Sequence, residues 1–90
     1  GISSVKLLQH VRGLLEEHLY VIGNIDATII AQRPKMAPHI HQMQENIASC
    51  LHCSIEQVSI KATRGEKLGF VGNEEGMVAM SVCLLEEVCA

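Results

Sequence analysis

Two short runs of the sequence join strand-like residues to loop residues that can bind phosphate. The first, Ala31 to Met36, reads AQRPKM, and the second, Lys61 to Phe70, reads KATRGEKLGF. Each follows a stretch that is typical of a buried strand, and each then breaks at a proline or a glycine. Because ligands of α/β folds collect at the carboxyl ends of strands, the two runs predict a nucleotide site at one edge of a small sheet.

Three side chains in these runs suit phosphate chemistry. The hydroxyl of Thr63 and the backbone N–H groups beside it can hold a phosphate oxygen. Glu66 offers the carboxylate oxygen that Mg²⁺ on a diphosphate prefers. Lys35 can balance a phosphate charge at the start of a helix. Turns and solvated surfaces also use these residue types, so the residues alone leave both interpretations open.

The first half of the sequence predicts a helix and then a strand. Apolar residues recur at helical spacing from Val5 to His18, after Ser3 or Ser4 as the cap. β-branched residues predict a strand over Ile25 to Ala31, and the glycine and asparagine before it indicate a break or a bulge. We expect this helix to cover one face of a sheet.

The second half predicts a helix followed by two strands. Apolar residues from Ile40 to Leu51 recur at helical spacing after two prolines, and Val58 to Ala62 alternates as a strand does. A glycine-containing loop leads to a third strand over Met77 to Leu85, which we expect to be well buried, with Cys83 packed. The order α-β-α-β-β predicts an α/β fold of the two-layer α+β kind. Its mixed sheet would carry helices on one face, in a ferredoxin-like or chorismate-mutase-like build.

Composition limits the classes of protein to which this chain can belong. Ninety residues allow one domain, and a hydrophobic content of 48% with two aromatic residues predicts a small aliphatic core. Such a core favours oligomerisation. The net charge of −3 and the scattered basic residues argue against nucleic acid as a partner. No apolar run approaches the roughly 20 residues that span a bilayer, and no signal peptide is visible, so we expect a cytoplasmic protein.

The cysteines and histidines allow a second interpretation. Cys50 and Cys53 have the spacing of zinc ligands, and three histidines are near in sequence. However, this pair falls where a helix ends, and reduced thiols are ordinary in the cytoplasm. We expect His39 and His41 to be surface or capping residues. The small zinc protein therefore stays as an alternative, together with a non-catalytic ligand-binding module.

The quoted runs resemble a known enzyme family. Asn24 to Met36 (NIDATIIAQRPKM), Pro38 to Ile40, and Lys61 to Phe70 closely resemble 2-C-methyl-D-erythritol 2,4-cyclodiphosphate synthase, in order and with matching spacing. The resemblance covers nearly the whole chain but only the C-terminal part of that family. We therefore expect residues 1–90 to be the C-terminal part of a single synthase domain, without the N-terminal part that carries the zinc ligands, and inactive by itself.

The resemblance implies a reaction. Enzymes of this family act in the non-mevalonate isoprenoid pathway, in the cytoplasm or in plastids. The substrate is a cytidine diphosphate ester of methylerythritol phosphate, whose own 2-phosphate attacks the β-phosphorus and releases CMP. Zn²⁺ and Mg²⁺ (or Mn²⁺) are the implied cofactors, with no zinc ligand in this sequence.

The resemblance also implies roles for individual residues. The catalytic residues would be Thr63 and Glu66, with Glu66 as the Mg²⁺ ligand. The cytidine and phosphate groups would be bound by Ala31, Pro34, Lys35, Met36, Ala37, Thr63 and Arg64. The family is a homotrimer with active sites between subunits, and Phe70, Asn73 and Met80 would lie near its axis.

Four positions depart from the pattern of the family: Arg64, Gly65, Asn73 and Met80. Many relatives have three threonines where this chain has Thr63, Arg64 and Gly65, so a hydroxyl expected at the phosphate is replaced by a guanidinium or by nothing. Many also have arginine at the position of Asn73 and glutamate at that of Met80. Because both charges are missing together, neither is left unpaired, and we expect a less polar trimer axis.

Overall fold

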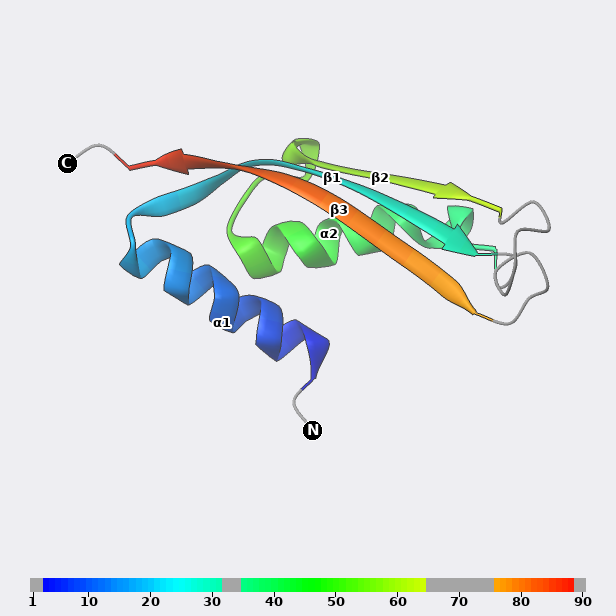
Figure 1. Ribbon diagram of the computed structural model, residues 1–90, viewed down its shortest axis with the longest axis horizontal. Coiled ribbons are helices and arrows are strands. Elements are labelled where there is room, and N and C mark those ends of the chain that lie inside the picture. Colours follow the sequence, from blue (N-terminus) through cyan, green and yellow to red (C-terminus); the bar gives the residue numbers. More distant parts are fainter. Residues whose placement is uncertain (1–2, 32–34, 65–75, 89–90) are drawn as a thin grey trace.

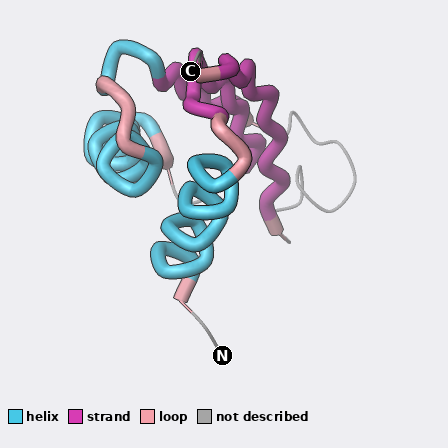
Figure 2. The backbone as a smooth tube through the Cα atoms, turned by 90° about the vertical axis from the view of Figure 1, so that its left-hand side faces the viewer, coloured by secondary structure: helices cyan, strands magenta, loops and turns pink. Residues whose placement is uncertain are grey.

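Two helices lie on one face of a three-stranded sheet in the computed structural model of the protein (Figure 1). The structure describes residues 3–31, 35–64 and 76–88. Seen from the side, the helices form one layer and the strands the other (Figure 2). The predicted mixed sheet with helices on one face is thus confirmed. The elements are α1 (Ser4–Glu17), β1 (Tyr20–Ala31), α2 (Ile40–Leu51), β2 (Val58–Thr63) and β3 (Met77–Glu87).

Capping residues define α1 at both ends. The Ser3 hydroxyl accepts a hydrogen bond from the backbone N–H of Lys6 at 3.1 Å, as a serine N-cap does. The helix stops at His18, and Leu19 then adopts a positive φ of 63°. Leu8 and Leu15 pack on the core from this helix, although no residue of α1 is fully buried. The helix therefore contributes one face to the core and leaves the other exposed.

A bulge lets β1 start earlier than the predicted Ile25. The register between β1 and β3 shifts between Ile22 and Asn24, so the strand extends back to Tyr20. Side chains three residues apart normally point to opposite faces of a strand, but the extra residue of a bulge brings both Ile22 and Ile25 into the core. The sequence predicted either a break or a bulge at Gly23 and Asn24, and the structure shows a bulge there.

The sheet order places the two quoted runs side by side. The strands lie in the order β2-β1-β3, with β1 parallel to β2 and antiparallel to β3. Ile25 pairs with Val58 and Ile30 with Thr63, so the carboxyl ends of β1 and β2 share one edge. The chain connects these parallel strands through α2, which begins at that same edge (Figure 1).

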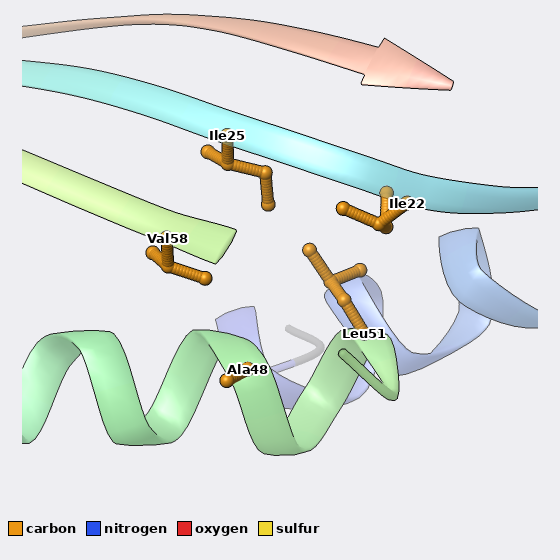
Figure 3. Packing of buried hydrophobic residues seen from close by; sticks show 5 residues of the cluster. All are labelled: Ile22, Ile25, Ala48, Leu51 and Val58. Atoms are coloured by element: carbon orange, nitrogen blue, oxygen red, sulfur yellow. The ribbon is translucent and has the colours of Figure 1, made fainter. Parts of the chain in front are cut away.

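Five aliphatic residues from β1, α2 and β2 form the centre of the core (Figure 3). Val58 is the most enclosed, with 1% of its surface exposed. α2 follows the short 3₁₀ helix η1 (Ala37–His39), with Pro38 in the first turn, where its missing N–H costs nothing. α2 ends at His52, whose φ of 54° is left-handed. The core residues are Ile22, Ile25, Ala48, Leu51 and Val58.

The prediction that the third strand is well buried is wrong for the described residues. Every residue of β3 except Val78 is exposed, and so is Cys83, which we expected to be packed. The reason is geometric, because β3 is an edge strand and both helices cover the same face of the sheet (Figures 1 and 2). On the other face, which we call the open face, Val82 is 75% exposed, Leu84 58% and Met80 57%.

Candidate functional site

A cavity of about 440 Å³ lies at the edge where β1 and β2 end. Its volume is within the roughly 300–1,000 Å³ of small-molecule sites. The segment that leads into α2 forms another part of its wall. The described residues around it are Ala31, Lys35, Met36, Ala37, Ala62, Thr63 and Arg64.

The paired strand ends explain why there is space at this edge. Ala62 lies opposite Ile29 in the ladder, and Ala31 follows two residues later on β1. Residues that are two apart point to the same face of a strand, so both alanines face the helix layer. Because each contributes only a methyl group, the backbone of both strands lies close to the cavity. Backbone N–H and C=O groups there can hydrogen-bond the polar edge of a ligand.

The described lining is positively charged. Lys35 and Arg64 are both exposed and both border the cavity. Thr63 adds a hydroxyl, which donates to the Arg64 carbonyl oxygen over 3.5 Å, at the limit of a hydrogen bond. No carboxylate is among the described lining residues. Two cations and a hydroxyl favour an anionic ligand, and phosphate in particular.

The structure brings together most of the residues that the sequence singled out for cytidine and phosphate. Pro34, Glu66, Phe70 and Asn73 are outside the described residues. Met80 lies away from these lining residues, opposite Thr28 on the open face. The six that border the one cavity are Ala31, Lys35, Met36, Ala37, Thr63 and Arg64.

One lining residue is missing from the predicted set. Ala62 borders the cavity beside Thr63, although the sequence treated it only as the last apolar position of the second strand. The signal for it was the alternation from Val58, which places Ala62 on the helix side of the sheet, at the level of the first strand's end. A small residue at that position could have been assigned to the site.

The cysteine pair does not form a metal centre among the described residues. Within residues 3–31, 35–64 and 76–88, no three histidine, cysteine or acidic side chains are grouped as metal ligands would be. Cys50 is buried in α2. Burial raises the pKa of Cys53, which disfavours the thiolate that zinc requires. The cavity lining is equally unsuited to a metal, because a lysine and an arginine donate hydrogen bonds rather than electron pairs.

A second polar cluster joins the ends of the two helices. Arg12 Nη1 donates to His52 Nε2 at 2.5 Å, and His52 Nδ1 lies 3.3 Å from Glu16 Oε1. Arg12 Nε is 3.6 Å from the same carboxylate oxygen. These three residues border a much smaller cavity than the one at the strand ends. The sequence did not suggest the cluster, which ties α1 to the C-cap of α2.

Sequence comparison relates almost the whole chain to one family. The model of the YgbB family matches residues 1–86. The 2-C-methyl-D-erythritol 2,4-cyclodiphosphate synthases of Agathobacter rectalis and Desulfitobacterium hafniense are each 56% identical to this chain, over 85 and 88 residues. These alignments cover 94% and 98% of this chain but 48% and 56% of the two relatives. The chain thus spans about half the length of the curated relatives it matches.

Solved structures have the same fold. The synthase of Plasmodium vivax superimposes with a TM-score of 0.91 at 35% identity, covering 94% of this chain and 57% of that one. The Plasmodium falciparum protein IspF, solved as a complex with CDP, also gives 0.91 at 31% identity, covering 97% and 56%. No helix among the described residues is long and apolar enough to cross a membrane.

Proposed function

The chain belongs to the YgbB family, and on this premise we propose that the protein is a 2-C-methyl-D-erythritol 2,4-cyclodiphosphate synthase. The observation that carries the proposal is the identity of 56% to synthases over almost the full chain. The cavity supports it, because the expected substrate-binding residues border one space of the right size and charge. The pathway in this proposal is the non-mevalonate route to isoprenoids, and the location is the cytoplasm or a plastid.

The proposed reaction is an intramolecular phosphoryl transfer. An oxygen of the substrate's 2-phosphate forms a bond to the β-phosphorus of its cytidine diphosphate group. The bond between that phosphorus and the oxygen that bridges to the α-phosphorus breaks. CMP leaves with the electron pair, and the two remaining phosphates form a cyclic diphosphate. Because the substrate supplies its own nucleophile, the protein contributes position and charge rather than a reacting side chain.

We assign the cytidine end of the substrate to the small and apolar part of the cavity. Ala31, Met36 and Ala37 form this part, and Pro34 completes it in the proposal. Their short or apolar side chains leave the backbone to satisfy the polar edge of cytosine. The P. falciparum relative, which has the same fold, was solved in complex with CDP, and this supports a cytidine nucleotide as the ligand.

The phosphates are assigned to the polar part of the cavity. In this proposal the Thr63 hydroxyl donates to a phosphate oxygen and Lys35 neutralises charge there, and their place in the lining supports both roles. Thr63 is held at the end of β2 by its pairing with Ile30 of β1. A donor fixed by a sheet costs little reorganisation when charge develops on the ligand, which is the requirement for transition-state stabilisation.

Metal ions enter the proposal through residues outside the described ranges. Zn²⁺ and Mg²⁺ (or Mn²⁺) are the expected cofactors, and Glu66 is the expected Mg²⁺ ligand. A divalent cation there would neutralise charge on the diphosphate. We assign no zinc ligand to this chain and give the described lining residues to the substrate alone.

The apolar open face supports a homotrimer. Val82, Met80 and Leu84 expose more than half of their surface on this face, opposite Asp26, Thr28 and Asn24 of β1 respectively. Contiguous exposed apolar side chains of this kind mark interaction surfaces. We assign the face to the contact between subunits, with Met80 and Asn73 near a weakly polar axis.

The test is turnover by the full-length protein with Zn²⁺ and Mg²⁺. Phosphorus NMR should show the cyclic diphosphate forming, and chromatography should show CMP released in equal amount. Thr63→Val should lower kcat, because it removes only the hydroxyl. Binding of CDP without any cyclic product would indicate the non-catalytic binding module instead. Binding of zinc without CDP would indicate the cysteine-histidine zinc protein.

A further inference from the structure

We infer that Arg64 makes this site select a nucleoside diphosphate over the corresponding monophosphate, an inference that rests on the proposed function. The guanidinium of Arg64 would bind the phosphate farther from the ribose, beside the Thr63 hydroxyl. Lys35 would remain at the nucleoside side of the same cavity. The residue is therefore a specificity determinant and also favours release of the monophosphate product.

The two cations reach the cavity from different segments of the chain. Lys35 immediately precedes Met36 and Ala37, which line the apolar part of the cavity. Arg64 immediately follows Thr63, the last residue of β2. The order of residues along each segment therefore places Lys35 next to the apolar end and Arg64 next to the hydroxyl.

The sheet fixes the position from which the Arg64 side chain extends. Thr63 pairs with Ile30 in the ladder of β1 and β2, so the base of the Arg64 side chain is set by the sheet. The side chain itself is exposed and borders the cavity. An arginine in this situation presents a planar set of donors that matches two oxygens of one phosphate, which a hydroxyl cannot do.

Two cations discriminate between ligands by the number of phosphates. A nucleoside monophosphate brings one phosphate, whose charge Lys35 would neutralise. The second phosphate of a diphosphate brings additional negative charge and oxygens for Arg64. In the proposed reaction the second phosphate passes into the cyclic diphosphate, so CMP has no phosphate for Arg64 and is not held by this cation.

Calorimetric titration of the full-length protein with CDP, CMP and cytidine tests the inference. For Arg64→Gln we expect CDP to bind about tenfold more weakly, equivalent to about 1.4 kcal/mol. CMP and cytidine should change less than twofold. Arg64→Lys should recover part of the CDP affinity, and the dependence of CDP binding on salt should become less steep in Arg64→Gln. Lys6→Gln, which removes an equal charge from the exposed side of α1, is the matched control.

The outcomes separate the two proposals. If the unmodified protein binds CDP but Arg64→Gln weakens CDP and CMP equally, or weakens neither, the inference is wrong and the proposed function stands. If the unmodified protein binds none of the three cytidine ligands, the proposed function fails and the inference fails with it. Circular dichroism of each variant checks that the fold is intact.

Discussion

Replacing Gln57 by glutamate tests how the bulge in β1 is held. Gln57 Nε2 donates to the Gly23 carbonyl oxygen at 2.8 Å and to the Ile22 carbonyl oxygen at 3.2 Å, while Gln57 Oε1 accepts from the backbone N–H of Ser54 at 2.8 Å. Glutamate keeps the acceptor but loses both donors. Two partly buried hydrogen bonds of about 1 kcal/mol each predict a loss of about 2 kcal/mol in the free energy of unfolding.

Urea unfolding of the full-length protein, followed by circular dichroism at one protein concentration, measures this loss. The concentration is fixed because association would shift the apparent stability. The midpoint should fall while the slope stays constant, since the compactness of the folded state is unchanged. Gln42→Glu is the matched control, because Gln42 makes one exposed hydrogen bond to Asn46 at 2.9 Å and should cost less than about 0.5 kcal/mol. Equal losses in the two variants would refute the role given to Gln57.

Three further predictions concern packing, association and thiol reactivity. Gly23→Ala should lower the free energy of unfolding by about 1 kcal/mol. The Cβ of the new alanine would lie 3.2 Å from the Leu84 carbonyl oxygen and 2.9 Å from Glu86 Oε1. Unchanged stability in urea would contradict this close contact. Val82→Glu should convert the proposed trimer to smaller species in analytical ultracentrifugation, and an intact trimer would exclude the open face as the contact. Burial raises the pKa of Cys53 and so reduces its thiolate fraction. Alkylation of Cys53, followed by mass spectrometry, should therefore be slower than alkylation of free cysteine, and it should accelerate as the pH rises. Equal alkylation rates at pH 7.5 would contradict the raised pKa.

The order of the helices and strands was predictable from the periodicity of apolar residues in the sequence. The helical spacing of apolar residues and the alternation around Val58 gave the element order and the mixed sheet, which the structure confirms. The extension of β1 to Tyr20 was not predicted, because it depends on a bulge that Gln57 supports from a distant part of the chain. Local sequence marks a bulge and a break with the same glycine, so only the tertiary contact decides between them.

The exposure of β3 shows a different limit of prediction from the sequence. Its apolar residues occupy both faces of the strand, and such a pattern is typical of a strand covered on both sides. The pattern indicates that burial of both faces is favourable, but it does not identify the part of the chain or the neighbouring molecule that covers them. Val82 and Leu84 are exposed among the described residues for this reason, and the prediction of burial was wrong for them.

The position of the cavity was predictable from the sequence. Two strand ends with phosphate-binding residues predicted one edge of the sheet, and the cavity lies at that edge. Ala62 was missed because an alanine at the end of a strand carries no chemical signal of its own. What the lining residues bind stays a prediction, because their roles come from resemblance and from charge.

The parallel pairing of β1 and β2 has a consequence for hydrogen exchange. The described lining residues lie either where the chain leaves β1 towards α2 or at the carboxyl end of β2. In the proposed function, a bound nucleotide would therefore contact both strands of one β-α-β unit, β1 and β2. Local opening of this unit would have to release the ligand, so binding slows exchange of its backbone amides most strongly. The amides of α1, which lies outside this unit, should be protected much less.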